Sequence, residues 1–267
     1  MATTSVTTSQ QSSFTNQILH GDCIEVMRQM PASSVDFILT DPPYLVNYRD
    51  RDGRTIQNDA DDTWLKPAMA EAYRVLKQDR VAVMFYGWTK VDAFFEAWRN
   101  AGFQPVGHIV FRKSYSSKSR FLRYQHEQAF LLAKGRPPLP KQPLGDVMEM
   151  PYSGNKLHPT QKPVAALVPL IRSFTLAGET VLDPFAGSGS SCAAALPTGR
   201  KYIGMEMDEK LNFQKLLGSF WRIFPRLLAH LVCDSGPASD GHAPVPACMC
   251  LKANFSGSTS LRRPSEL

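Results

Sequence analysis

A glycine-rich turn between two strand-like runs constrains the fold of this chain more than any other feature. Residues 181–183 form a short β-type run, the turn contains Gly187 and Gly189, and a small-residue helix then leads to a strand that ends at Glu206. Glycines permit tight backbone geometry, and the N-terminus of a helix offers free N–H groups to an anion. Nucleotide-binding α/β units place an acid roughly 20 residues further on, where it accepts hydrogen bonds from ribose hydroxyls. A glycine-rich turn alone is weak evidence, but with both strands and Glu206 it predicts a cofactor site.

The rest of the chain alternates between strand and helix patterns. Strands are expected at residues 18–20, 35–40, 81–86, 106–111, 127–133, 181–183 and 201–205, and helices at residues 23–30, 63–76, 91–101 and 164–174. Residues 45–62 are polar and should form a mobile loop. This alternation predicts an α/β fold with one doubly wound sheet, whose ligands bind at the carboxyl ends of the strands. A chain of 267 residues is long enough to hold one such domain.

A second motif, Asp41-Pro42-Pro43-Tyr44, follows the apolar run at residues 35–40. A residue before proline is pushed toward extended geometry, and prolines have no N–H group. The turn therefore presents acceptors, namely the Asp41 carboxylate and backbone carbonyls, beside the aromatic face of Tyr44. Such a turn suits a flat ring that carries an amino group. For the turn on its own, a rigid corner between strand and loop is the alternative interpretation.

Four blocks, in their order along the chain, resemble the amino-directed DNA methyltransferases that use S-adenosylmethionine. The blocks are Gly21-Asp22-Cys23, Asp41-Pro42-Pro43-Tyr44, His-Pro-Thr-Gln-Lys-Pro at residues 158–163, and Asp-Pro-Phe-Ala-Gly-Ser-Gly-Ser at residues 183–190. The catalytic block precedes the cofactor block, which resembles the circularly permuted β group. The resemblance spans about residues 18–209 and implies a Rossmann-like methyltransferase sheet in a single domain.

The resemblance also implies roles for individual residues. Asp41 and the Pro42 carbonyl would accept the N–H bonds of the target amino group, and Tyr44 would stack on the ring. Asp22 would meet the adenine of the cofactor, although a helix N-cap is a sound and compatible alternative for it. The implied cofactor-binding residues are Asp22, the backbone at Cys23, His158, Thr160 and Lys162 near the donor carboxylate, Asp183, Phe185, Gly187 and Gly189 around the methionine moiety, and Glu206 at the ribose.

A basic and aromatic segment follows Phe111. Between residues 111 and 141, eight lysines and arginines are opposed only by Glu127, and aromatic residues lie between them. This pattern is typical of a nucleic-acid surface, and a solvated basic face is the alternative. The DNA-contacting region of the resembled family falls here, at about residues 111–157, so double-stranded DNA is the expected partner. The predicted substrate contacts are Pro43, Phe111, Arg112, Lys113, Arg120 and Arg123.

The expected activity is methyl transfer to the N6 amino group of adenine in duplex DNA, after the base has been flipped out of the helix. Cytosine N4 is the closest alternative, and Asp41 favours adenine because N4 enzymes more often resemble Ser-Pro-Pro-Tyr. RNA or protein amides are less favoured, since those relatives more often resemble Asn-Pro-Pro-Tyr. Relatives in the β group are often homodimers, and a cognate restriction enzyme is not required.

The ends of the chain carry separate expectations. Residues 1–16 should be a disordered tail without a targeting signal, residues 17–232 the methyltransferase domain, and residues 233–267 an atypical, disordered tail. After residue 209 the chain departs from the family pattern, which suggests either an altered gene end or a divergent helix. An altered end would allow a catalytically impaired DNA-binding variant.

The composition points to a reducing cytoplasm. No apolar stretch approaches the ~18 residues of a membrane span. The five cysteines lack paired metal-ligand spacing, so free thiols and no metal are expected.

Overall fold

The computed structural model describes residues 14–49, 53, 55–56, 58–116, 121–152 and 161–208. Predictions for most of the N-terminal tail, for the chain after residue 208, and for His158, Thr160 and Arg120 lie outside these residues.

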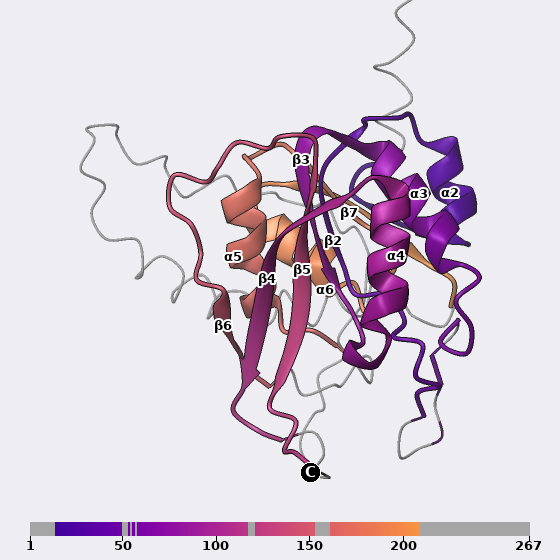
Figure 1. The fold of residues 1–267 in the computed structure, drawn as a ribbon. Helices are drawn as coiled ribbons and strands as arrows, with labels where there is room; N and C mark the ends of the chain where they lie inside the picture. Colours follow the sequence, from indigo (N-terminus) through magenta and orange to yellow (C-terminus); the bar gives the residue numbers. More distant parts are fainter. Residues whose placement is uncertain are drawn as a thin grey trace, which may run out of the picture. The chain divides into compact units, whose positions relative to one another are not determined.

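The described residues form one mixed sheet with strand order β1-β8-β7-β2-β3-β5-β4-β6 (Figure 1). The strands are β1 (Gln17–His20), β2 (Val35–Thr40), β3 (Leu76–Phe85), β4 (Gln104–Lys113), β5 (His126–Lys134), β6 (Val147–Met150), β7 (Thr180–Asp183) and β8 (Lys201–Glu206). The first five strands in this order run parallel, β5 is antiparallel to both β3 and β4, and β6 is parallel to β4. The predicted α/β sheet is confirmed, with an antiparallel region on one side.

The register of the central strands brings the two sequence motifs to the same edge of the sheet. Ile38 of β2 pairs with Leu182 of β7 on one side and with Ala82 of β3 on the other. Because these strands are parallel, their carboxyl ends coincide, and ligands of α/β sheets bind at that edge. Asp41 and Asp183 therefore follow neighbouring strand ends, although the chain separates them by more than half of its length.

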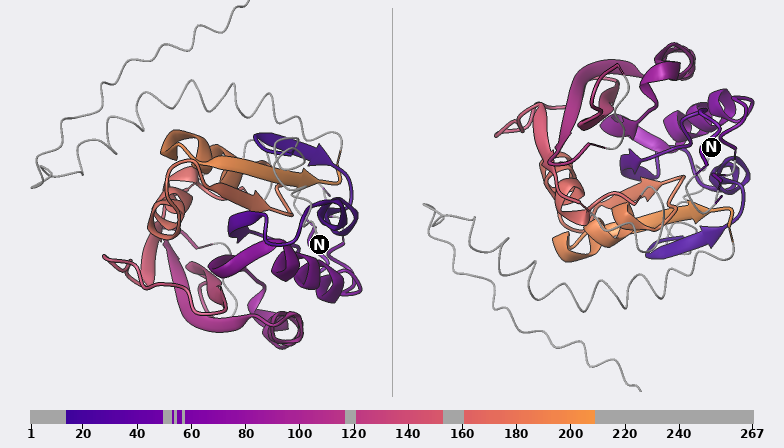
Figure 2. Two further views of the ribbon diagram at one scale, coloured as in Figure 1. Left: turned by 90° about the horizontal axis from the view of Figure 1, so that it is seen from above. Right: turned by 90° about the horizontal axis from the view of Figure 1, so that it is seen from below.

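Helices cover both faces of this sheet (Figures 1 and 2). They are α2 (Cys23–Gln29), α3 (Leu65–Val75), α4 (Val91–Ala101), α5 (Val164–Phe174) and α6 (Ser190–Ala195), with short 3-10 turns η1 (Trp88–Lys90) and η2 (Leu196–Thr198). The first three helices pack on one face, and α5 and α6 lie on the other. None of the helices in the described part of the chain is long and apolar enough to cross a membrane.

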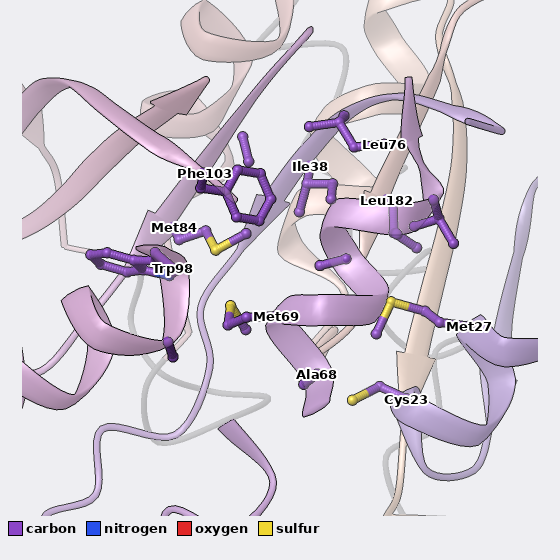
Figure 3. Packing of buried hydrophobic residues seen from close by; sticks show 14 of the residues in the cluster. Cys23, Met27, Ile38, Ala68, Met69, Leu76, Met84, Trp98, Phe103 and Leu182 are labelled. Atoms are coloured by element: carbon purple, nitrogen blue, oxygen red, sulfur yellow. The ribbon is translucent and has the colours of Figure 1, made fainter. Parts of the chain in front are cut away.

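The core follows the period-two alternation of a strand that is buried on both faces. All six residues of β2 are buried, and Phe37 contacts Phe174 of α5 with ring centroids 5.8 Å apart. Ile38 points to the other face, where it joins the cluster of Met69, Met84 and other side chains under α3 (Figure 3). The turn at residues 41–44, the candidate catalytic turn, therefore extends from a strand that is anchored on both sides.

Most predicted elements lie within about two residues of the observed bounds, with local exceptions. The strand at residues 35–40 and the helices at 91–101 and 164–174 match, and α4 ends at Gly102, whose φ of 105° is left-handed. A Cβ there would lie 2.9 Å from the Tyr73 ring, which explains the glycine. β3 begins at Leu76 rather than at residue 81, directly after α3. The small-residue helix expected after the glycine-rich turn is present as α6, and β6 was not predicted.

Candidate active site

The Asp41 carboxylate is held by two donors at the carboxyl end of β2. The Tyr44 hydroxyl donates to Asp41 Oδ1 at 2.7 Å, and Lys162 Nζ donates to Asp41 Oδ2 at 2.5 Å. Gly87, just beyond β3, packs against this turn so closely that an added Cβ would lie 2.8 Å from the carbonyl oxygen of Tyr44. The structure thus fixes the direction of the carboxylate before any substrate is present.

Lys162 lies at the catalytic turn, between two carboxylates. Its ammonium is 3.0 Å from Glu127 Oε2 and also lies over the Phe85 ring, while only 6% of the residue is exposed. Burial lowers the pKa of Lys162, but the carboxylates of Asp41 and Glu127 outweigh it and raise this pKa above the usual value. Lys162 is therefore a cation throughout the physiological range.

Glu127 completes a chain of alternating charges that the sequence did not predict. It lies at the start of β5, between Lys162 and Lys113, whose ammonium is 3.5 Å away. Burial raises the pKa of Glu127, but the two lysines lower it more strongly, so the carboxylate is ionised. The sequence did contain a signal for this network. Glu127 is the one acid in the basic segment, and a lone acid among lysines is a candidate partner for them.

Asp183 connects β2 to the glycine-rich turn. Its carboxylate accepts hydrogen bonds from the Thr40 hydroxyl at 2.7 Å, from the Phe185 backbone N–H at 3.1 Å, and from the Ser191 hydroxyl. Burial raises the pKa of Asp183 to about 6, while these hydrogen bonds act in the opposite direction. Asp183 thus organises the ends of β2 and β7, with both of its oxygens engaged by neighbouring protein groups.

Glu206 shapes the glycine-rich turn from the end of β8. Its Oε2 accepts the Gly187 N–H at 2.7 Å, and its Oε1 accepts the Asp208 N–H at 2.9 Å. Gly187 and Gly189 have φ angles of 50° and 75°, which explains the glycines, and Gly189 caps α6. Each carboxylate oxygen has a second lone pair, so Glu206 can still accept hydrogen bonds from a bound ligand.

Asp22 and Cys23 lie beside Glu206. The Gly21 N–H donates to the Glu206 backbone carbonyl at 2.9 Å, and Asp22 Oδ1 accepts the Ile24 N–H at 2.8 Å as the N-cap of α2. The N-cap interpretation is confirmed. Burial and the neighbouring Asp22 raise the pKa of the Cys23 thiol to about 12, and burial also raises that of Cys192. Both thiols are therefore neutral and poor nucleophiles.

A cleft lies between the candidate catalytic turn and the glycine-rich turn. It has about 420 Å³ of empty volume, including the part that is open to solvent. Its lining consists of Leu39, Thr40, Asp41, Phe85, Lys162, Leu167, Asp183, Phe185, Ala186, Gly187, Ser188, Ser190 and Ser191. Phe185 is braced from outside this set by Trp64, with ring centroids 5.0 Å apart, and sequence reasoning did not single out Trp64. Within the described residues, no group of three or more metal-ligating side chains accompanies the cleft.

The predicted DNA contacts divide into two groups. Arg112 and Arg123 are exposed, with Arg112 paired to Glu149, and Pro43 is half-buried at the catalytic turn. Phe111 has no exposed surface and stacks on Phe85 with ring centroids 4.9 Å apart. Such a side chain cannot stack on a base while β4 is intact, so the prediction for Phe111 is corrected.

Lys113 requires the same correction. It is only 5% exposed and its ammonium faces Glu127, so its charge serves the buried network rather than a phosphate. Phe111 and Lys113 both occupy inward positions of β4, and Arg112 occupies the outward position between them.

Comparisons with known proteins agree with this geometry. A family model described as DNA methylase (N6_N4_Mtase) matches residues 35–212. YubD of Escherichia coli (strain K12), which carries a provisional methylase name, is 59% identical over 197 residues, covering 74% of this chain and 87% of YubD. The DNA adenine methyltransferase YhdJ of the same organism is 29% identical over 233 residues, covering 72% of this chain and 79% of YhdJ.

Solved structures share the fold. The complex of M1.HpyAVI with S-adenosylmethionine has a TM-score of 0.61 at 22% identity, covering 75% of this chain and 98% of that one. The cytosine-N4-specific PvuII DNA methyltransferase also has a TM-score of 0.61, at 17% identity, covering 78% of this chain and 92% of that one. The described sheet is that of a methyltransferase fold, and the chain belongs to the N6/N4 family of DNA methylases.

Proposed function

We propose that this DNA methyltransferase transfers the methyl group of S-adenosylmethionine to the N6 amino group of adenine in duplex DNA. One observation carries the proposal. The Asp41 carboxylate, fixed by Tyr44 and Lys162, borders a cleft whose other wall is the glycine-rich turn. An acceptor for an amino group and a candidate site for a methyl donor thus share one cleft.

The chemistry requires acceptors at the amino group. The exocyclic nitrogen of adenine is a weak nucleophile because its lone pair is delocalised into the ring. Asp41 and the Pro42 carbonyl accept its two N–H bonds, which favours a pyramidal nitrogen and frees the lone pair. Each oxygen of Asp41 bonds one protein donor and keeps a lone pair for the substrate.

The donor side of the cleft fits S-adenosylmethionine. This cofactor supplies a methyl group on a positively charged sulfur. Glu206 offers lone pairs to the ribose hydroxyls, and Asp22 lies beside it for the adenine end. Phe185 and Gly187 line the wall toward Asp41, where the methionine moiety would lie. Holding the two reactants in this geometry accounts for much of the catalysis.

Duplex DNA must present the base outside the helix. Extrusion costs a few kcal/mol. The Tyr44 ring is half-buried beside Asp41, and stacking on it contributes about 1–3 kcal/mol per base. Arg112 and Arg123 are exposed at the same end of the sheet, where they can contact phosphates.

Adenine is favoured over cytosine by the residue at position 41. Asp-Pro-Pro-Tyr resembles the adenine enzymes, and YhdJ, with 29% identity, is named a DNA adenine methyltransferase. Cytosine N4 is the second candidate, since the PvuII enzyme shares the fold and the same amino-group chemistry.

The test is incubation with labelled S-adenosylmethionine and unmethylated duplex DNA, followed by nucleoside analysis. N6-methyladenine is the expected product, and the Asp41→Ala variant should make none while still binding the cofactor. N4-methylcytosine as the sole product would refute the adenine assignment. Loss of cofactor binding in Asp41→Ala would show that the catalytic turn is misassigned.

A further inference from the structure

The hairpin between β4 and β5 turns at the catalytic edge of the sheet. β5 is antiparallel to β3, with Phe85 opposite Ala129, so β5 begins where β3 ends. The Lys113 N–H donates to the Gln125 carbonyl at 2.8 Å, which closes the hairpin at the same level. In Figure 1 the hairpin turns at the lower end of the sheet, which is the end where the catalytic turn follows β2.

Large apolar side chains of this hairpin are exposed to solvent. Phe121 is fully exposed and Leu122 is 71% exposed. At the root of the hairpin, Trp88 is 59% exposed and stacks on Tyr124 with ring centroids 6.3 Å apart and an interplanar angle of 29°. Single exposed apolar residues are common, but a group of them beside an active site indicates an interaction surface.

The surroundings of these side chains indicate a nucleic acid as the partner. Arg123 is adjacent and exposed, and the sequence places further basic residues at positions 118 and 120. From residue 111 to residue 125 the chain carries no acid. Basic residues close in sequence to exposed apolar side chains are complementary to the phosphates and bases of a nucleic acid.

We propose that Phe121 and Leu122 form a wedge that enters the duplex next to the target base and fills the gap that the flipped base leaves. Apolar wedges from other DNA-binding proteins unstack base steps in this way. Trp88 and Tyr124 support the hairpin between the wedge and the catalytic turn, because Gly87, next to Trp88, contacts Tyr44. The inference rests on the proposed function, since it assigns the step that delivers a base to Asp41.

The wedge makes a specific kinetic prediction. A Phe121→Ala/Leu122→Ala variant should lose about tenfold or more in single-turnover transfer rate on a fully paired target, since wedge insertion offsets the cost of unstacking. On a duplex whose target base faces an abasic site, flipping costs less, and the variant should recover to within about threefold of the wild type. The substrate carries the site that methylation mapping identifies, whichever base it contains.

A matched control exists at the opposite edge of the sheet. Leu139 is 91% exposed and lies beyond the far end of β5, so Leu139→Ala should leave both rates unchanged. With 2-aminopurine at the target position, fluorescence should rise on binding to the wild type and to Leu139→Ala, but much less with the double variant.

Two results would overturn the wedge. One is an equal loss of rate on the paired and the abasic duplex, which would assign the hairpin to docking alone. The other is no loss on either duplex. Failure of the proposed function is distinguishable, because the wild type would then either methylate neither substrate or methylate cytosine instead of adenine.

Discussion

Replacement of Lys162 by methionine separates two roles for this residue. Its place in the His-Pro-Thr-Gln-Lys-Pro block implies contact with the cofactor carboxylate, whereas the structure places its ammonium 2.5 Å from Asp41 and 3.0 Å from Glu127. We expect Lys162→Met to impair the transfer step and to leave the affinity for S-adenosylmethionine nearly unchanged.

The expected size of the effect follows from the contacts. A hydrogen bond to a charged group contributes about 1.5–3 kcal/mol. If this energy fixes the direction of the Asp41 carboxylate in the transition state, its loss lowers the transfer rate by about 10- to 150-fold. Loss of the cation also leaves two carboxylates with Lys113 alone, and breaking a buried pair typically costs about 3–5 kcal/mol of stability.

The stability loss can be separated from the catalytic loss. In Lys162→Met/Glu127→Gln the second carboxylate is neutral, so much of the unfolding free energy should return while the transfer rate stays low. Lys66→Met is the matched control, because Lys66 forms a 2.6 Å ion pair with Glu96 but both side chains are more than half exposed. Lys66→Met should change neither the unfolding free energy nor the activation free energy of transfer by more than about 1 kcal/mol.

The assays are single-turnover transfer at saturating DNA and cofactor, equilibrium binding of S-adenosylmethionine, and denaturant unfolding. A tenfold weaker affinity for the cofactor with an unchanged transfer rate would refute this reasoning and restore the role in binding the cofactor carboxylate.

Three further substitutions test other parts of the site. Glu206→Gln should raise the dissociation constant for S-adenosylmethionine about 10-fold or more, measured by calorimetry, with the rate at saturation retained; equal affinity would exclude Glu206 from the cofactor site. Tyr44→Phe keeps the ring but removes the 2.7 Å hydrogen bond to Asp41, so the single-turnover transfer rate should fall about tenfold while the affinity for DNA is unchanged. Weaker DNA binding with an unchanged transfer rate would contradict this assignment. The pKa of Asp183 is raised from 3.8 to about 6, so its contribution to stability is full below pH 3.8 and is lost as the pH rises through 6. Relative to Asp183→Asn, the wild type should therefore lose about 3 kcal/mol of unfolding free energy across this window, and a pH-independent difference would contradict the assignment.

Local patterns were sufficient for most of the fold. The buried run of β2, in which Val35, Phe37, Ile38 and Leu39 are apolar, and the left-handed glycine after α4 act within a few positions, so the sequence predicts both bounds. β6 has only four residues, which is too short a run to predict from its sequence, and it exists through pairing with β4. The polar start of β3 is likewise held by its neighbours, since Leu76 pairs with Val35 of β2 and the Lys77 ammonium donates to Asp36 at 2.7 Å.

The parts of the site that follow the end of a strand could be predicted from their motifs. The parts that depend on the direction of a side chain could not. Parallel β2 and β7 bring the Asp41 and Asp183 turns together, as the motifs predicted. The charge network was missed because it depends on β5 lying next to β3, which places Glu127 beside Lys162. Composition alone likewise could not show that Lys113 points inward and Arg112 outward, although the alternation along β4 contained that information.

The most direct test of the central claim is sequencing of modified bases in DNA from cells that express this chain, with cells that express Asp41→Ala as the control. The measurement reports activity, base and target site together. We predict N6-methyladenine at one short recurrent sequence, present with the wild-type chain and absent with Asp41→Ala. N4-methylcytosine in its place, or N6-methyladenine that persists with Asp41→Ala, would contradict the account.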